Sequence, residues 1–312
     1  MGGRKMDHRR MERVVYPGTD LEVSRLCLGT VNYGVTLDQN GVNAQLEAFL
    51  SLGGNFVDTA HVYSNWLPGE TSRSEKMVGK ALKALDRKQV ILSTKGAHFD
   101  FAKPEISRVT PENIVKDLGE SLEHLDTDYV DLYFLHRDNT AVPVGELIDC
   151  LDEQVQKGRI RWIGCSNWTL DRVKEAAAYS QRTGKARFAV NQLMWSLAKI
   201  NRAGIPADYV LMDQETMAFS AENAMGIMCY TSLARGYFTK RWKGINLGTD
   251  LTKVYQNPEN DRIFEEIRQL PSAETVTRYC LRYFVDQPVT AVPIVTCNNA
   301  DQLSECCAAF LL

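Results

Sequence analysis

Residues 110–136 read TPENIVKDLGESLEHLDTDYVDLYFLH and carry one helix signal followed by one strand signal. Thr110 is a suitable N-cap and Pro111 a suitable first helical residue, and apolar residues then recur at helical spacing. The apolar run that begins at Val130 is nearly continuous, which is typical of a parallel strand buried on both faces. This stretch therefore predicts a helix that leads into a fully buried strand.

The same alternation of short apolar runs and helical patterns covers the rest of the chain. Seven further strand candidates begin near Cys27, Asn55, Val90, Ile160, Phe188, Met225 and Val289. Other helical patterns span residues 144–155, 169–178 and 272–284. Eight strand–helix units predict an α/β fold, a closed (β/α)8 or TIM barrel forming one domain over residues 13–312. A doubly wound open sheet is the alternative, but it normally carries GxGxxG after its first strand, and this sequence has no such motif.

Three segments lie outside this repeat. Residues 13–26 read as a β-hairpin around the turn PGTD at 17–20, and residues 1–12 are predicted to be a disordered tail. The step between the strand candidates at Met225 and Val289 is the longest, which predicts a long loop after strand seven, from Arg235 to about Pro271. Because this loop is rich in basic residues and contains Trp242, we expect it to close over an anionic ligand.

Composition narrows the class of protein. The 312 residues carry a formal net charge of -3 and a pI of about 6.0, which argues against a nucleic-acid-binding protein. No run of 18 apolar residues occurs, so no membrane span is expected. The eight cysteines form no CxxC pair and no zinc-ligand spacing, and no secretory signal pattern precedes them. We therefore expect reduced thiols in a cytoplasmic protein without a metal site; nothing in the sequence defines an oligomeric state.

Four polar side chains fall where predicted strands end: Asp58, Tyr63, Lys95 and His136. Each alone has an ordinary explanation, such as a loop cap, rim packing, a surface lysine or a satisfied core histidine. In a barrel, however, all strand ends meet at one rim, so the four should lie together there.

An acid, a phenol, an ammonium and an imidazole at one rim form a coherent chemical unit. A phenol ordinarily titrates at about pH 10, and a nearby ammonium would stabilise the phenolate and lower that pKa. A carboxylate would hold the ammonium, and a neutral imidazole could orient a carbonyl group. The set predicts a general acid aimed at a carbonyl oxygen, with hydride supplied by a cofactor.

Six ordered motifs at strand ends resemble the aldo-keto reductase family, from about residue 26 to residue 309. The motifs are DTAHVY at 58–63, STKG at 93–96, DLYFLH at 131–136, GCSN at 164–167, VNQ at 190–192 and YTSLARG at 230–236. The resemblance implies a (β/α)8 barrel and NADP(H) as cofactor. It also implies an oxidoreductase that converts an aldehyde or ketone to an alcohol, or the reverse.

The resemblance assigns a role to each matching residue. It implies that Tyr63 is the proton donor, Lys95 the group that lowers its pKa, Asp58 the partner of that lysine, and His136 the group that orients the carbonyl. The residues implied to bind the cofactor are Gly29, Thr30, Ser166, Asn167, Gln192, Tyr230, Ser232, Leu233, Arg235, Gly236, Gln302 and Cys306.

The C-terminal part departs from the family pattern. Val295 and Thr296 stand where the family usually has Pro and Gly, and Cys306 stands where an asparagine commonly contacts adenine. Gln302 replaces an arginine that many members place on the 2′-phosphate, so NAD(H) is the alternative cofactor. The chain ends at Leu312, without the C-terminal segment that in many relatives helps to form the substrate pocket.

Loops at the rim offer Asn32, Trp66 and Trp168 as substrate contacts. Aromatic faces mixed with amides suit a ring that bears hydroxyl groups, which favours a sugar or keto-sugar substrate. An aliphatic aldehyde and a steroid-like ketone are the alternatives.

Two other classes of function compete with the reductase. One is a regulatory subunit that binds a nicotinamide cofactor but turns over little, as some family members do. The other is a metal-dependent barrel hydrolase or isomerase, which needs clustered ligands at strand ends. The sequence has only five histidines, and His136 lacks an evident ligand neighbour.

Overall fold

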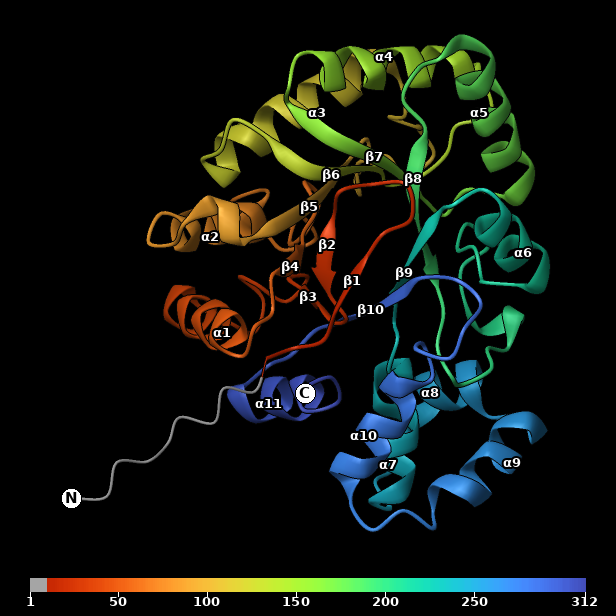
Figure 1. Cartoon of the computed structure of the whole chain (residues 1–312). Helices are drawn as coiled ribbons and strands as arrows, with labels where there is room; N and C mark the ends of the chain where they lie inside the picture. The colour runs from red at the N-terminus through yellow and green to blue at the C-terminus, as the bar shows by residue number, and fades with distance from the viewer. Residues whose placement is uncertain (1–9) are drawn as a thin grey trace.

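A closed barrel of eight parallel strands forms the centre of the computed structural model, which describes residues 10–312 (Figure 1). The strands are β3 (Cys27–Gly29), β4 (Phe56–Asp58), β5 (Ile91–Gly96), β6 (Val130–Leu135), β7 (Ile160–Ser166), β8 (Phe188–Met194), β9 (Gly226–Tyr230) and β10 (Ala291–Val295). Each strand pairs with the next, and β10 pairs with β3 to close the barrel. All eight predicted strands and the barrel are confirmed.

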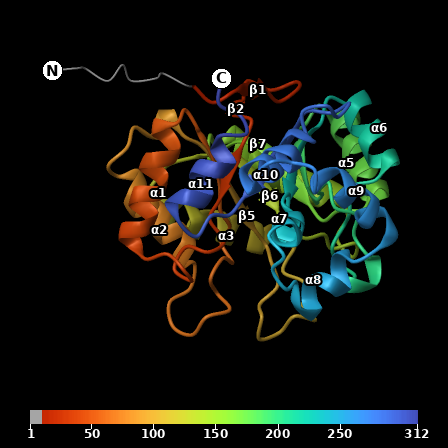
Figure 2. The same ribbon diagram turned by 90° about the horizontal axis from the view of Figure 1, so that it is seen from below.

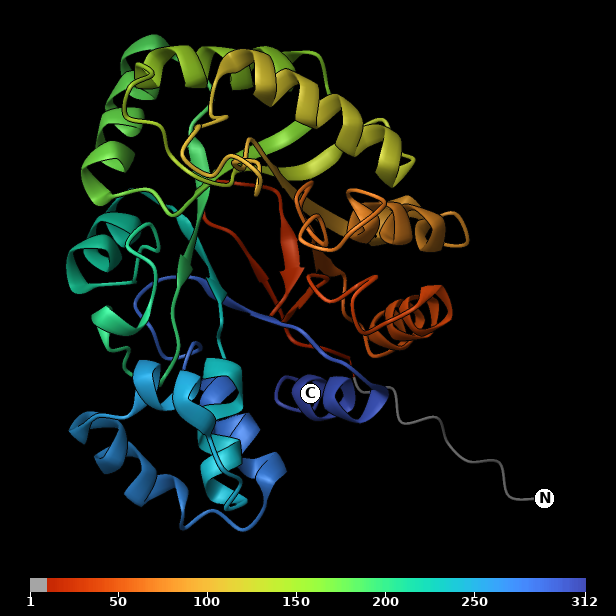
Figure 3. The ribbon, with the colours of Figure 1, turned by 180° about the vertical axis from the view of Figure 1, so that it is seen from behind.

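Helices surround the barrel on the outside (Figure 3). The surrounding helices are α1 (Gln39–Ser51), α2 (Arg73–Leu82), α3 (Pro111–Leu125), α4 (Val144–Gln156), α5 (Leu170–Thr183), α6 (Gln214–Glu222), α10 (Ala273–Arg282) and α11 (Ala300–Cys307). In α3 the side chain of Thr110 accepts a hydrogen bond from the Asn113 N–H, Pro111 follows it, and Ile114 and Leu118 are buried. The helix predicted to begin at Thr110 is therefore confirmed.

The predicted hairpin closes the end of the barrel at which the strands begin. It consists of β1 (Arg13–Val15) and β2 (Glu22–Ser24), paired antiparallel. The Tyr16 hydroxyl donates to the Ile227 carbonyl at 3.3 Å, and Asp20 accepts a hydrogen bond from Trp162 Nε1 at 2.7 Å. The loops after the barrel strands leave from the opposite end (Figure 2).

The predicted N-terminal tail is too long. Residues 1–9 lie outside the described residues, but Met11 is buried and pairs with Leu311 in a β-bridge. Glu12 forms ion pairs with Arg25 at 3.2 Å and Arg282 at 2.9 Å. Residues 11 and 12 are thus part of the fold, because one fills an apolar site and the other pairs with two cations.

The long segment predicted after strand seven follows β9 as expected, but it is helical and not an open loop. The segment folds into α7 (Tyr237–Trp242), α8 (Gly248–Tyr255) and α9 (Pro258–Ile267), which lie together beside α10 (Figure 1). Tyr237, Phe238 and Leu251 are buried in a small apolar cluster there. α7 and α8 span only six and eight residues. α9 begins with the N-cap Asn257 followed by Pro258, the same signal as Thr110 and Pro111, so this helix could have been predicted.

The state of the cysteines agrees with the expectation of reduced thiols. All eight cysteines are buried and unpaired. Within residues 10–312, no helix combines the length and the apolar character needed to cross a bilayer.

Candidate active site

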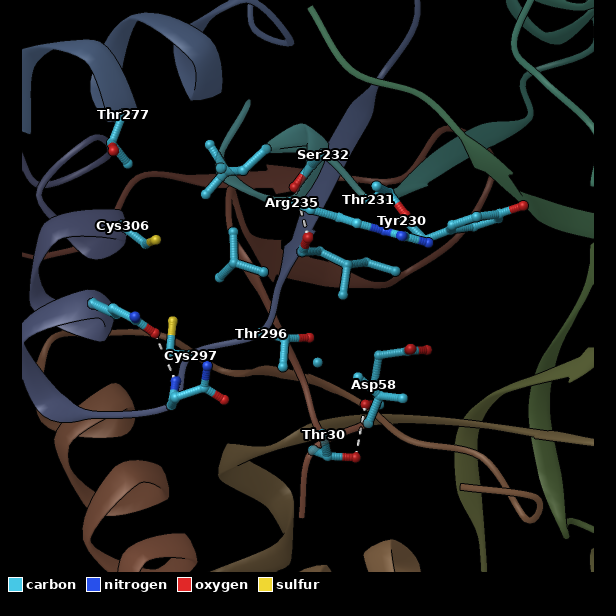
Figure 4. Close-up of a pocket in the computed structure, with 18 of the residues that line it drawn as sticks. Thr30, Asp58, Tyr230, Thr231, Ser232, Arg235, Thr277, Thr296, Cys297 and Cys306 are labelled. Atoms are coloured by element: carbon cyan, nitrogen blue, oxygen red, sulfur yellow. Dashed lines mark hydrogen bonds between the residues drawn. The ribbon is translucent and has the colours of Figure 1, made fainter. Parts of the chain in front are cut away.

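A cavity of about 810 Å³ opens at the end of the barrel where the strands finish (Figure 4). All twelve residues predicted to bind the cofactor line it: Gly29, Thr30, Ser166, Asn167, Gln192, Tyr230, Ser232, Leu233, Arg235, Gly236, Gln302 and Cys306. Asp58, Tyr63 and His136 line it as well. The strand ends therefore bring the predicted site residues together as expected for a barrel.

Lys95 lies fully buried behind the cavity wall and connects three groups. Its Nζ donates hydrogen bonds to Asp58 Oδ2 at 2.6 Å, to the Thr59 carbonyl at 2.8 Å and to Tyr63 Oη at 3.0 Å. Burial alone would lower the pKa of Lys95, but Asp58 and Tyr63 outweigh it and the pKa is raised. The lysine is thus a fixed ammonium that holds the phenol of Tyr63 at the edge of the cavity.

Asp58 is held on its other oxygen by neutral donors. Asp58 Oδ1 accepts hydrogen bonds from Ser93 Oγ at 2.8 Å and from Gln192 Nε2 at 3.2 Å. A buried carboxylate that pairs with an ammonium and two further donors has its charge compensated in place. Asp58 therefore fixes the position of Lys95.

The pKa of Tyr63 differs from the sequence-based argument. Burial raises it above the ordinary value, and the opposing charge of Lys95 does not fully compensate. The sequence argument considered only the ammonium and not the desolvation of the phenol. Tyr63 is therefore a protonated phenol that can donate a proton.

His136 is a neutral imidazole next to this phenol. Burial lowers the pKa of His136 well below its usual value, and the nearby His98 and Arg137 lower it further. The rings of Tyr63 and His136 lie 6.0 Å apart, edge to face. His136 Nδ1 is buried and has no hydrogen-bond partner among the described residues. Because Nδ1 is enclosed, a ligand can reach only the other edge of the ring, which faces the cavity.

Amide and hydroxyl groups cluster near Tyr230, at the end of β9. Asn167, in a left-handed backbone conformation with φ 58°, accepts hydrogen bonds from Tyr230 Oη at 2.6 Å and from the Val210 N–H at 3.2 Å. Its amide nitrogen donates to Ser166 Oγ at 3.1 Å. These groups offer an amide-binding surface beside an aromatic face, which fits a nicotinamide.

A cationic wall follows β9. Arg235 and Gly236 have φ values of 54° and 77°, so the chain turns sharply there and exposes backbone to the cavity. Arg235, Lys240 and Lys243 line the cavity on this side. The close-up shows the Arg235 side chain extending toward Tyr230 (Figure 4). Cations along a curved backbone suit the phosphates of a dinucleotide.

The opposite end of the cavity lies between β10 and α11. Gln302 accepts a hydrogen bond from the Asn298 N–H at 2.8 Å, and Cys306 and Cys297 both face the cavity (Figure 4). Thr277 donates a short hydrogen bond to Glu305, and both residues also line the cavity. Sequence analysis missed Thr277 and Glu305, although Glu305 directly precedes the predicted Cys306.

The chain was compared with known proteins. A model of the aldo/keto reductase family matches residues 25–312. This chain belongs to the aldo-keto reductase family. Members of the family are NAD(P)H-dependent oxidoreductases of carbonyl and alcohol groups, and the chain is assigned to that class of enzyme.

Individual aldo-keto reductases resemble the chain over most of its length. It is 29% identical to probable aldo-keto reductase 1 of Glycine max, over 90% of this chain and 80% of that protein. It is 28% identical to a probable voltage-gated potassium channel subunit beta of Oryza sativa subsp. japonica, over 77% of this chain and 69% of that protein. Among solved structures, the thermostable aldo-keto reductase Tm1743 in complex with the inhibitor epalrestat has the same fold. Its TM-score is 0.71 at 23% identity, over 96% of this chain and 94% of that one.

The three substrate residues predicted for this aldo-keto reductase do not line the cavity. Asn32 is buried, and its amide donates to the Cys297 carbonyl at 2.8 Å. Trp168 is buried, and its Nε1 donates to the Arg137 carbonyl at 3.0 Å. Trp66 is 43% exposed and packs against Phe101. Asn32 and Trp168 therefore support loops, and only Trp66 remains available to a ligand.

The structure adds aromatic residues that sequence analysis missed. The ring of His98 lies 4.7 Å from that of His136, and it continues outward to Phe99 at 4.0 Å and Phe101 at 5.6 Å. Phe101 in turn meets Trp66 at 6.2 Å. Burial lowers the pKa of His98 to about 4, so this ring is neutral as well. We call His98, Phe99, Phe101 and Trp66 the aromatic wall.

One group of metal-ligand type lies away from the cavity of this aldo-keto reductase. In the described residues, ligand atoms of His61, Asp117 and Glu120 lie within 4.8 Å of one another. His61 Nε2 is 2.7 Å from Glu120 Oε2, and Asp117 is already paired with Arg108. Their arrangement is thus explained by a hydrogen bond between His61 and Glu120 and an ion pair between Asp117 and Arg108.

Proposed function

We propose that this chain is an active NADP(H)-dependent reductase in which Tyr63 donates the proton to a carbonyl oxygen. One observation carries the proposal: Lys95 Nζ bonds at once to Asp58 Oδ2 and Tyr63 Oη, at 2.6 Å and 3.0 Å, beside a long cavity. A structural ion pair alone would not need to hold a phenol at the cavity edge. Replacement of Tyr63 by Phe tests the proposal, because it removes the hydroxyl that would donate the proton.

In this proposal each side chain has one task. A bound nicotinamide supplies the hydride. Tyr63 gives its hydroxyl proton to the carbonyl oxygen, and the ammonium of Lys95 stabilises the phenolate that remains. The neutral imidazole of His136 orients the carbonyl group, and Asp58 keeps Lys95 charged and in position.

The residues that would hold the cofactor divide into three groups along the cavity. Ser166, Asn167 and Gln192 would bind the nicotinamide amide, with Tyr230 against its ring. The cationic wall after β9 would bind the phosphates. Gln302 and the other residues between β10 and α11 would hold the adenosine.

We propose a carbonyl substrate with a flat apolar part, in place of the sugar expected from the sequence. The aromatic wall begins at His98, next to the cavity residue His136. It ends outside the cavity lining at two rings, Phe101 and Trp66, that are each 43% exposed. Aromatic rings in such a row favour a planar apolar partner. The buried position of Asn32 removes one of the amides on which the sugar hypothesis depended.

A regulatory subunit with little turnover is the second candidate function. The similarity to the potassium channel subunit beta of Oryza sativa subsp. japonica favours it. Tyr63, Lys95 and Asp58 in hydrogen-bond contact favour the enzyme instead. Steady reduction of an aromatic aldehyde with NADPH would support the reductase, and cofactor binding without turnover would support the subunit.

For the reductase we propose a cytoplasmic location, which the eight unpaired, buried thiols support.

We expect NADPH to protect the cationic wall from trypsin, because bound phosphates would hold Lys240 and Lys243 against the cavity. Cleavage between Arg235 and Lys253 should slow when NADPH is present. Lys116 on α3 is an internal control, since its side chain is 63% exposed and does not line the cavity. Equal slowing at Lys116, or no slowing at the wall, would contradict the prediction.

We expect NADPH to bind more tightly than NADH, because a cavity lined by Arg235, Lys240 and Lys243 attracts the cofactor that carries the additional phosphate charge. Gln302 cannot supply a charged contact, so Gln302→Arg should widen the preference for NADPH by about tenfold, the worth of one charge-assisted hydrogen bond. Quenching of protein fluorescence by each cofactor measures both affinities. Tighter binding of NADH to the unmodified protein would assign the chain to NAD(H).

A further inference from the structure

Arg137 is a cation at the reaction end of the cavity that the proposed cofactor contacts do not use. It directly follows His136 and lines the cavity. The other cations of the lining, Arg235, Lys240 and Lys243, all belong to the wall after β9, where the phosphates are proposed to bind. Arg137 instead follows β6, directly after His136, and its charge reaches Tyr63.

Neighbouring groups hold the Arg137 side chain in one position. Nε donates to Asp208 Oδ2 at 2.9 Å, and Nη1 donates to the His136 carbonyl at 2.9 Å. The guanidinium carbon lies 5.4 Å from the centre of the Tyr209 ring. The side chain is only 15% exposed, yet Nη2 has no hydrogen-bond partner among residues 10–312. The guanidinium thus has a fixed direction and one free donor group.

The charge of Arg137 reaches the rings around the reaction centre. Burial is the main influence on the pKa of Tyr63, Tyr230, His98 and His136, and the positive charge of Arg137 lowers all four. One of these rings is the proposed acid, one orients the carbonyl, and one begins the aromatic wall. A ligand held between these rings therefore lies within reach of the positive charge of Arg137.

We propose that Arg137 binds a carboxylate carried by the same substrate molecule as the reacting carbonyl group. The inference rests on the proposed function, because it assumes a carbonyl held by Tyr63 and His136. A guanidinium suits a carboxylate because its planar donors form charge-assisted hydrogen bonds. Asp208 accepts a hydrogen bond from Nε only, and its side chain is 47% exposed. It therefore orients the guanidinium and leaves Nη2 for the substrate.

A purely structural role for Arg137 makes a different prediction. The Arg137–Asp208 pair connects the loop after β6 to the loop after β8. A strut, meaning a pair whose sole role is to hold the two loops together, is therefore the alternative to a binding site. Arg137→Met and Asp208→Asn both break this pair, but only Arg137→Met removes the cation. A strut predicts the same defect in both variants, whereas a carboxylate site predicts a defect in Arg137→Met alone.

The test compares two aldehydes that share a ring and a reacting group. 4-Carboxybenzaldehyde carries the anion, and methyl 4-formylbenzoate is its neutral counterpart. In Arg137→Met, kcat/KM for the carboxylate should fall about 10- to 100-fold through KM, the worth of a lost charge-assisted hydrogen bond, with little change for the ester. Asp208→Asn should keep the preference for the carboxylate, and Arg137→Lys should restore part of it.

Two outcomes would overturn the proposal. Equal losses in Arg137→Met and Asp208→Asn would show a strut. An equal fall of kcat for both aldehydes in Arg137→Met would show that the charge acts on Tyr63 rather than on the substrate.

Binding of benzoate separates this inference from the proposed function. If the unmodified protein reduces neither aldehyde, the proposed function fails, but titration calorimetry of benzoate in the presence of NADPH still tests Arg137. Binding that is lost in Arg137→Met and kept in Asp208→Asn would support the carboxylate site. Equal binding by the unmodified protein and Arg137→Met, or no binding by either, would overturn it.

Discussion

Tyr63→Phe should reduce the rate of carbonyl reduction by about 10²- to 10⁴-fold, the usual worth of a positioned general acid. The substitution removes only the hydroxyl that accepts a hydrogen bond from Lys95 at 3.0 Å. The ring can keep its edge-to-face contact with His136. The fold and the affinity for the cofactor should therefore change little, and the loss should appear in the chemical step.

Single-turnover oxidation of NADPH measures that step directly. Tyr209→Phe is the matched control, because Tyr209 also lines the cavity and its hydroxyl contacts neither Lys95 nor Asp58. This control should react at nearly the unmodified rate. If Tyr63→Phe also transfers hydride at the unmodified rate, Tyr63 is not the acid and His136 becomes the next candidate.

The fold could be predicted because its signals are local. Strands buried on both faces appear as continuous apolar runs, and helix starts such as Thr110–Pro111 carry their own capping chemistry. The prediction for the segment after β9 was incomplete for the opposite reason. Its helices α7 and α8 are short, and they are stabilised by packing between Tyr237, Leu251 and their neighbours, which no local pattern reveals. Only α9 carries a local signal, the Asn257 N-cap followed by Pro258.

The residues of the candidate site show the same difference between local signals and contacts that depend on distant residues. Tyr63, Lys95 and His136 follow strand ends, and barrel geometry brings strand ends together whatever the loops do. Side chains on loops depend on loop conformation, so Trp168 turned out to be a buried support and not a cavity residue. The aromatic wall was invisible because it joins two loops that are separate in sequence. Arg137 was overlooked although it adjoins His136, since its direction is set by Asp208 on a distant loop.

Lys95→Met should impair reduction as severely as Tyr63→Phe, because the phenolate would lose the only ammonium that contacts it among the described residues. The change also leaves Asp58 charged and buried, and removal of one member of a buried ion pair costs about 3–5 kcal/mol of stability. Asp58→Asn combined with Lys95→Met removes both charges and serves as the control for folding. A thermal melt should show recovery of stability in this double variant, while reduction stays lost. Recovery of activity together with stability would mean that Lys95 is structural only.

The combination of Tyr63→Phe with Lys95→Met distinguishes a shared role from two separate ones. If Lys95 acts by stabilising the Tyr63 phenolate, removal of the hydroxyl leaves the ammonium nothing to stabilise. The double variant should then lose no more than the more impaired single variant, since both changes act on one proton transfer. Independent contributions would instead multiply, and the rate would fall by the product of the two single losses. Single-turnover rates of the four proteins provide this comparison, and multiplication of the losses would assign Lys95 a task in the cavity that does not pass through Tyr63.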